Sequence, residues 1–125
     1  MRMARGKPID DDQVLTCAFR YNPEFAEAHG RPLADGRFLV LAGSTALRSS
    51  AASVKRDRAE RDRLVRLGVL APLPDADLYV FTRDHECSSA SQAAGIVKDG
   101  NASGPQLWKD PSTGKSLKDL LADTL

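Results

Sequence analysis

Three serines precede a short alanine-rich run in the stretch CSSASQAA, residues 87–94. The stretch follows LYVFT at residues 78–82, a β-favouring segment, so it is typical of a helix start that comes after a strand. A helix leaves its first backbone N–H groups without intrahelical partners. We expect Ser88 or Ser89 to accept one of these bonds as the N-cap, and Ser91 to accept another. The alanines that follow are small enough to let the helix approach a sheet closely.

The same residues support a second interpretation, in which the helix start holds a ligand. A helix N-terminus carries partial positive charge and spare donors, which suits a phosphate group. Serine hydroxyls add donors without bulk, and polar side chains farther along could extend the contact. The candidate nucleic-acid-binding residues in this part of the chain are Ser88, Ser89, Ser91, Gln92, Lys98, Asn101 and Lys109. The two interpretations are compatible, because a capped helix end can open to a ligand.

A charged helix is predicted over residues 54–67, with six basic and three acidic side chains. Opposite charges four residues apart, such as Arg58 and Asp62, can neutralise one another, so we favour a solvated face that pairs with itself. The alternative is a face that follows the phosphates of a nucleic acid, with Arg56 and Arg63 among its contacts. The arginines spread around the helix axis instead of forming one stripe, which weighs against that alternative.

Other reactive residue types are expected to have structural roles. His85, Glu86 and Cys87 could suggest a metal, but zinc needs three or four converging ligands and the other histidine, His29, is distant in sequence. We therefore expect no metal and no cofactor. The chain contains no nucleophile elbow, P-loop or dinucleotide fingerprint, so we expect no catalysis. Trp108 is expected in the core, and a stacking platform for a base is the alternative.

Composition limits the class of protein. The 125 residues are enough for one domain, and 42% hydrophobic residues suffice for a packed core. Eighteen basic against 17 acidic residues exclude an argument for nucleic acid from the whole-molecule charge. Cys17 and Cys87 are expected as free thiols in a reducing compartment. No stretch resembles a membrane span or a signal peptide, so we expect a cytoplasmic protein with a flexible tail at 1–12 and a single binding domain at 13–125.

The elements expected around these residues define an α+β domain, with a short antiparallel or mixed sheet of about four strands and about three helices. Strands are expected at 14–20, 37–42, 78–82 and 106–109, and helices at 54–67, 89–100 and 116–125. A short helix is considered at 23–29, and loops are expected at 45–51, 69–77 and 101–105. Gly68 should end the first long helix, and Ser116 should cap the last.

Four segments occur in a characteristic order: GRFLVLAGS, LVRLGVL, LYVFTRDHECSSASQAAGIV and NASGPQLWKD. Through these segments and their order, the chain resembles the bacterial domain-of-unknown-function family 4357 over roughly residues 26–121. That family is found as a C-terminal module of GIY-YIG-type and restriction-associated proteins and is related to the RAMA domain. The residues that match its pattern are Phe38, Val40, Ala42, Gly43, Ser44, Arg61, Leu64, Gly68, Val69, Leu70, Ser88, Ser89, Ser91, Ala93, Ala94, Gly104 and Trp108.

The chain departs from the family pattern at four positions. Cys87 replaces an aromatic residue, Ala90 a proline, Asp99 a small glycine and Ser103 an asparagine. The resemblance implies a non-enzymatic DNA-binding accessory module linked to restriction–modification or phage defence. The alternative is a protein-interaction module that docks on or inhibits a nuclease or another defence enzyme. The near-zero net charge and the acidic Asp99 favour this alternative.

Overall fold

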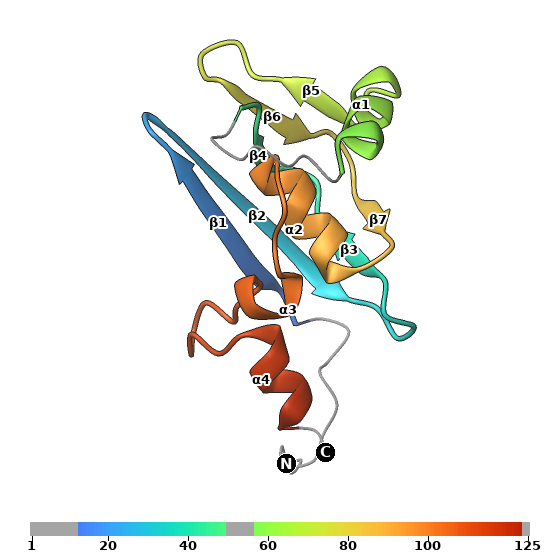
Figure 1. The fold of residues 1–125 in the computed structure, drawn as a ribbon, viewed down its shortest axis with the longest axis vertical. Helices are drawn as coiled ribbons and strands as arrows, with labels where there is room; N and C mark the ends of the chain where they lie inside the picture. Colours follow the sequence, from blue (N-terminus) through green and yellow to red (C-terminus); the bar gives the residue numbers. More distant parts are fainter. Residues whose placement is uncertain (1–12, 50–56, 124–125) are drawn as a thin grey trace.

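The computed structural model describes residues 13–49 and 57–123, which form two antiparallel sheets and four helices (Figure 1). The elements are β1 Leu15–Tyr21, β2 Glu24–Pro32, β3 Phe38–Val40, β4 Thr45–Leu47, α1 Arg58–Arg66, β5 Leu70–Pro72, β6 Leu78–Phe81, β7 His85–Cys87, α2 Ala90–Lys98, α3 Gly104–Leu107 and α4 Leu117–Ala122. The α+β class is as predicted, but the single sheet of about four strands that was expected is replaced by two sheets of four and three strands. The predicted tail at 1–12 lies outside the described residues. None of the described helices is long and apolar enough to cross a membrane.

The larger sheet has the strand order β1-β2-β3-β7. The short helix considered at 23–29 is wrong, because β2 pairs with β1 through seven residues in register from Leu15–Gly30 to Tyr21–Glu24. Ala26 and Ala28 are fully buried while Glu27 between them is exposed, the period of two that a half-buried strand requires.

The smaller sheet has the order β4-β6-β5 and includes two segments that were predicted as loops. Thr45–Leu47 and Leu70–Pro72 each form three residues of strand on either side of β6. Three residues are too short to show a period of two, so the pairing with β6, rather than a local pattern, defines them as strands. Figure 1 shows this sheet and α1 together at one end of the molecule, with α3 and α4 at the other.

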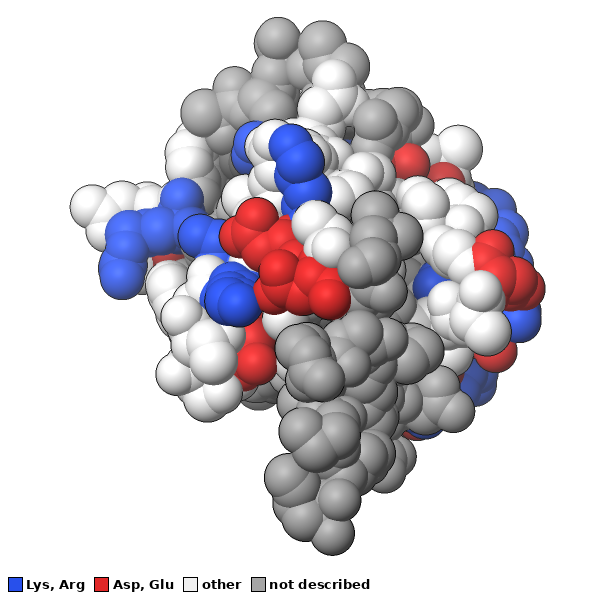
Figure 2. Space-filling model, turned by 90° about the horizontal axis from the view of Figure 1, so that it is seen from below, with Lys and Arg blue, Asp and Glu red and all other residues white. Residues whose placement is uncertain are grey.

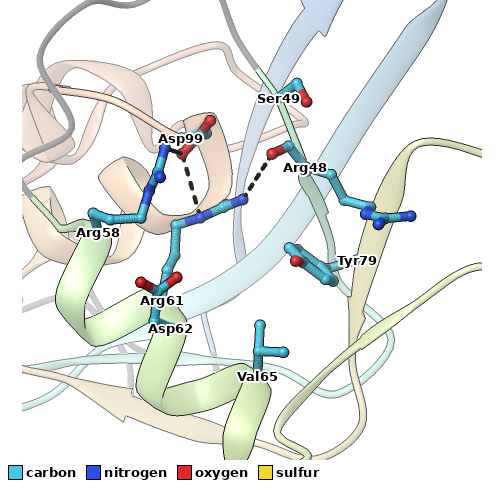
Figure 3. Close-up of a pocket in the computed structure, with 8 residues that line it drawn as sticks. All are labelled: Arg48, Ser49, Arg58, Arg61, Asp62, Val65, Tyr79 and Asp99. Atoms are coloured by element: carbon cyan, nitrogen blue, oxygen red, sulfur yellow. Dashed lines mark hydrogen bonds and ion pairs between the residues drawn. The ribbon is translucent and has the colours of Figure 1, made fainter.

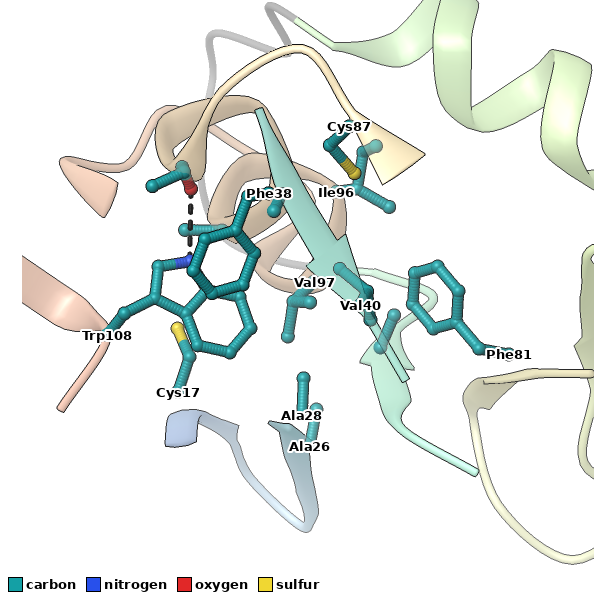
Figure 4. Close-up of a cluster of buried hydrophobic side chains, with 14 of the residues drawn as sticks. Cys17, Ala26, Ala28, Phe38, Val40, Phe81, Cys87, Ile96, Val97 and Trp108 are labelled. Carbon is teal, nitrogen blue, oxygen red and sulfur yellow. Dashed lines mark hydrogen bonds between the residues drawn. The ribbon is translucent and has the colours of Figure 1, made fainter. Parts of the chain in front are cut away.

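Helix α2 lies across the larger sheet and forms the centre of the core. Its alanines and glycine permit a close approach, and the buried residues of the helix are Ala90, Ala93, Ala94, Gly95, Ile96 and Val97. Trp108 is fully buried, with its ring centroid 4.3 Å from that of Phe38 (Figure 4). Its Nε1 donates a hydrogen bond to the carbonyl of Ala90 at 3.0 Å. The predicted core role of Trp108 is therefore confirmed.

The strand expected at 106–109 is wrong, because Gly104–Leu107 forms α3 with Pro105 in its first turn. Only Lys109, beyond the helix, makes β-bridges, with Thr16 and Ser116. Proline in the first helical turn needs no N–H partner, so the segment can begin a helix despite its short length.

Two predicted helix ends are confirmed. Gly68 follows α1 with a φ of 77°, which glycine adopts without steric cost. The N–H groups of Gly68 and Val69 donate to the carbonyls of Val65 and Leu64, which satisfies two carbonyls at the helix end. At α4, Ser116 Oγ accepts the N–H of Asp119 at 3.1 Å.

Candidate functional site

The serine cluster forms a closed cap at the start of α2. Ser89 is the N-cap, and its Oγ accepts the N–H of Gln92 at 3.0 Å. The side chain of Gln92 reaches back, and its Oε1 accepts the N–H of Ser88 at 2.8 Å. Ser91 differs from the prediction, because its Oγ accepts the N–H of Gly104 at 2.9 Å, which lies outside its own helix. The polar groups of this cluster thus hold the helix start together and fasten α3 to it.

The other predicted residues near α2 lie at its opposite end. Lys98 is in the last turn, where its Nζ donates to the carbonyl of Asn101 at 3.0 Å and lies 5.9 Å from the centroid of the Phe19 ring. A nine-residue helix is about 13 Å long, so Lys98 and Asn101 are remote from the serines. Lys109 is exposed and pairs through its backbone with Thr16. The structure therefore does not gather the predicted residues into one site.

An apolar groove of about 380 Å³ lies beside the start of α2. The β2–β3 turn, α3 and α4 contribute its lining together with the serines. The residues that line this groove include Pro32, Leu33, Arg37, Ser89, Pro105, Leu117 and Leu121. Arg37, at this turn, bonds to Asp35 at 2.8 Å and to Glu86. This charged side chain is therefore already paired within the protein.

A second cavity, of about 390 Å³, is polar and lies between α1, β4 and β6 (Figure 3). We call it the arginine pocket; it is lined by Arg48, Ser49, Arg58, Arg61, Asp62, Val65, Tyr79 and Asp99. The lining comes from four separate parts of the chain: the residues after β4, helix α1, strand β6 and the end of α2. Three guanidinium groups and two carboxylates share it, so its charge is positive by one unit.

Arg61 and Asp99 form the buried base of the arginine pocket. Only 4% of Arg61 and 2% of Asp99 are exposed, and Arg61 Nε lies 3.4 Å from Asp99 Oδ1. Arg61 Nη1 donates to the carbonyl of Ile96 at 2.6 Å and Nη2 to that of Arg48 at 3.3 Å. Burial lowers the pKa of Arg61, and the charge of Asp99 opposes this effect. The predicted solvated face of this helix is therefore wrong at Arg61, which points into the protein.

Asp99 also closes α2, in a conformation that acidic residues seldom adopt. It is the C-cap, with a φ of 64° in the left-handed region, and its N–H donates to the carbonyl of Gly95. Glycine is usual at a left-handed helix end, and asparagine and aspartate are the side chains that tolerate it best. The acidic residue at this helix end is thus the residue that anchors Arg61.

Arg48 and Arg58 form the accessible wall of the arginine pocket. Arg58 is half exposed, with Nη2 3.6 Å from Asp99 Oδ1. Arg48 Nε lies 3.6 Å from Asp77 Oδ1, and 39% of its side chain is exposed. Both separations exceed the usual hydrogen-bond distance, so these two arginines can turn towards a ligand. The Cζ atoms of Arg48 and Arg61 each lie 5.3 Å from the centroid of the Tyr79 ring, which Figure 3 places between them.

Arg63 belongs to a separate group of charges. Its guanidinium donates to both oxygens of Glu60, at 2.9 and 2.8 Å, and these bonds are the main cause of the lowered pKa of Glu60. His85 Nε2 lies 3.6 Å from Glu60 Oε2, and burial lowers the pKa of His85. Among residues 13–49 and 57–123, no three histidine, cysteine, aspartate or glutamate side chains are grouped to hold a metal.

Sequence reasoning named neither Arg48 nor Tyr79 as a site residue, and Arg56 lies outside the described residues. The available signal was Asp99, because an acidic residue in place of glycine at a helix end needs a cation nearby. That signal identifies no particular arginine, since the partners come from other elements.

The surface near α4 carries mixed charge. Seen from below in Figure 2, acidic side chains lie beside basic ones, and neither sign covers the described part of this face continuously. This agrees with the net charge of +1 for the whole chain. A cationic contact must therefore be local, as the arginine pocket is.

Comparisons with known proteins identify a family without a known activity. A family profile described as domain of unknown function (DUF4357) matches residues 19–121. No curated protein and no solved structure gives a significant match. The match begins within β1 and ends within α4, and it includes every residue that lines the arginine pocket. The chain therefore belongs to the family of domain of unknown function DUF4357.

Proposed function

We propose that this domain is a non-enzymatic binding module that contacts DNA through the arginine pocket. The observation that carries the proposal is the pair of accessible guanidiniums, on Arg48 and Arg58, beside a buried base formed by Arg61 and Asp99. Arginine matches phosphate oxygens through two parallel N–H donors. The fixed base holds the pocket in shape, while the two outer arginines reach the ligand.

The resemblance to modules of GIY-YIG-type and restriction-associated proteins, and to the RAMA domain, supports DNA as the phosphate-bearing ligand. It also supports a role in restriction–modification or phage defence. This support is an analogy with the proteins that carry such modules, and the site argument is independent of it. This proposal places the DNA contact at the arginine pocket instead of the serine cluster. The reason is that the hydroxyl oxygens of Ser89 and Ser91 already accept the N–H groups of Gln92 and Gly104.

The two cysteine thiols are unsuited to nucleophilic catalysis. Burial raises the pKa of both Cys17 and Cys87 to about 12. At neutral pH these thiols stay protonated, and a protonated thiol is a poor nucleophile. The only other sulfur-bearing residues are the two methionines, Met1 and Met3, which lack a nucleophilic thiol.

The test is fluorescence anisotropy of a labelled duplex, unmodified or adenine-methylated, at about 50 and about 200 mM salt, where phosphate contacts weaken with salt. Arg58→Gln should reduce affinity several-fold. Arg63→Gln is the matched control, because Arg58 and Arg63 lie on the same helix and are 50% and 48% exposed. Equal losses in both variants would indicate general electrostatics and contradict a pocket. No binding by the native protein at micromolar concentration in low salt would refute the DNA proposal.

The apolar groove favours a second candidate, a protein-interaction module. Leu121 is 48% exposed at its edge, and Leu33 and Pro105 line it. A nuclease or another protein of a defence system could insert an apolar side chain there. Under this candidate, Leu121→Asp should abolish co-purification with such a partner and leave DNA binding unchanged.

A further inference from the structure

The arginine pocket is shaped for a narrow group instead of a continuous strand. Its volume of about 390 Å³ is in the range of small-ligand sites. The side chains of Arg61 and Asp99 at its base are 5% and 3% exposed, so a ligand that reaches them must leave bulk water. An internal phosphate of a duplex is flanked by sugar on both sides and lies on a convex surface. A phosphate at the end of a strand is attached to a sugar on one side only, so it can enter the pocket.

The charges of the pocket also favour a terminal phosphate over an internal one. Three arginines outnumber the two carboxylates of the lining, Asp62 and Asp99, so the pocket attracts an anion. A phosphomonoester has a charge of about −1.5 to −2 and three terminal oxygens, so it binds two arginines better than a singly charged diester does. The exposed carboxylate of Asp62 can accept a hydrogen bond from a hydroxyl or amino group. A nucleotide carries both kinds of group, whereas inorganic phosphate lacks the sugar and base.

From this arrangement we infer that the arginine pocket binds the terminal phosphate of a nucleotide. Arg58 and Arg48 hold the phosphomonoester, and Arg48 leaves the ring of Tyr79 to do so. The face of Tyr79 that this movement opens packs against the sugar or base, and Asp62 accepts from a sugar or base donor. The inference rests on the proposed function, since it specifies which nucleic-acid phosphate the pocket contacts. The same chemistry occurs at the phosphorylated end of a DNA strand and in a free nucleoside monophosphate.

The experiment separates these sources with three labelled duplexes of one sequence, carrying phosphate at the 5′ ends, at the 3′ ends or at neither. Adenosine monophosphate and adenosine serve as competitors. We expect one phosphorylated duplex to bind about tenfold more tightly than the unphosphorylated one, equivalent to about 1.4 kcal/mol. Adenosine monophosphate should compete and adenosine should not. Arg58→Gln should remove the preference for the phosphorylated end, and Arg63→Gln should retain it.

Each other outcome has a defined meaning. Equal binding of all three duplexes, weakened by Arg58→Gln, would overturn the inference and leave the DNA proposal standing. Binding of adenosine monophosphate that depends on Arg58, without binding of any duplex, would support the inference for a free nucleotide and overturn the DNA proposal. Absence of binding to every probe by a folded protein would overturn both.

Discussion

At the start of α2 the polar groups are neutral, and the backbone N–H groups of Ser88 and Gln92 are bonded to side chains of the protein. At its end, by contrast, an acidic residue is paired with arginines of α1. Ser89 and Gln92 bond to backbone N–H groups at 3.0 and 2.8 Å, which are ordinary hydrogen bonds. Asp99 Oδ1 lies 3.4 Å from Arg61 and 3.6 Å from Arg58. The N-terminus of α2 has the sequence that resembles a phosphate site, yet it has fewer groups left to bind a ligand than the C-terminus.

The difference shows that donors must be counted after the protein has used them. A helix start can bind phosphate through its backbone N–H groups only while these are unpaired, and here the N–H groups of Ser88 and Gln92 donate to side chains. The arginine pocket has one fully engaged guanidinium and two with loose partners, so part of its hydrogen-bonding capacity remains. The following variants test this contrast, from the largest expected effect to the smallest.

Arg61→Met should have the largest effect, because it leaves the buried carboxylate of Asp99 without its closest cation. The free energy of unfolding should fall by about 3–5 kcal/mol, measured by urea denaturation. Arg61→Met combined with Asp99→Gly should recover much of this loss, since glycine tolerates the left-handed φ and removes the buried charge. A double variant no more stable than Arg61→Met would contradict the ion pair as the cause.

Gly104→Ala should weaken the other end of α2 by overpacking. A Cβ at this position would lie 2.1 Å from the backbone carbon of Ala90, so α3 or the helix start must shift. We expect a loss of about 1–3 kcal/mol in the free energy of unfolding. Ser103→Ala, at an exposed neighbour whose side chain makes no capping bond, is the control and should change stability by less than about 0.5 kcal/mol.

Ser89→Ala removes the cap and should lower the free energy of unfolding by about 1 kcal/mol. DNA affinity should stay within twofold of the native value, a change of less than about 0.4 kcal/mol. Ser88→Ala is the matched control, because the bond at Ser88 is made by its backbone N–H. A large loss of DNA affinity in Ser89→Ala, with little loss of stability, would show that the serine cluster binds the ligand.

The smallest effect concerns pH. Burial lowers the pKa of His85 in the folded protein, with Arg63 and Arg83 acting in the same direction and Glu60 opposing. As the pH falls, the unfolded chain is protonated first, so stability should decrease below about pH 6.5, the usual histidine value. His85→Gln should flatten this part of the profile in urea titrations between pH 7 and 5. An unchanged slope would show that other groups cause it.

Local rules predicted the features that depend on local chemistry. A cap at Ser88 or Ser89, the cap at Ser116 and the helix end at Gly68 follow from backbone donors and φ preferences, and the buried position of Trp108 follows from its apolar area. The β2 strand was missed because PEFAEAH also has helical character, and only pairing with β1 decides between the two. The arginine pocket could not be predicted, because Arg48, Tyr79 and Asp99 belong to distant segments and are brought together by the smaller sheet and the end of α2.

The left-handed backbone at position 99 restricts the residues that evolution can place there. Glycine, asparagine and aspartate are the side chains that adopt this conformation most readily, and of these only aspartate is charged. This one position therefore sets both the backbone of the helix end and the charge at the base of the pocket. An Asp99→Asn exchange would keep the left-handed backbone and make the pocket one unit more positive. It would also leave the buried guanidinium of Arg61 without its carboxylate partner, so the gain in positive charge would come with a loss of stability.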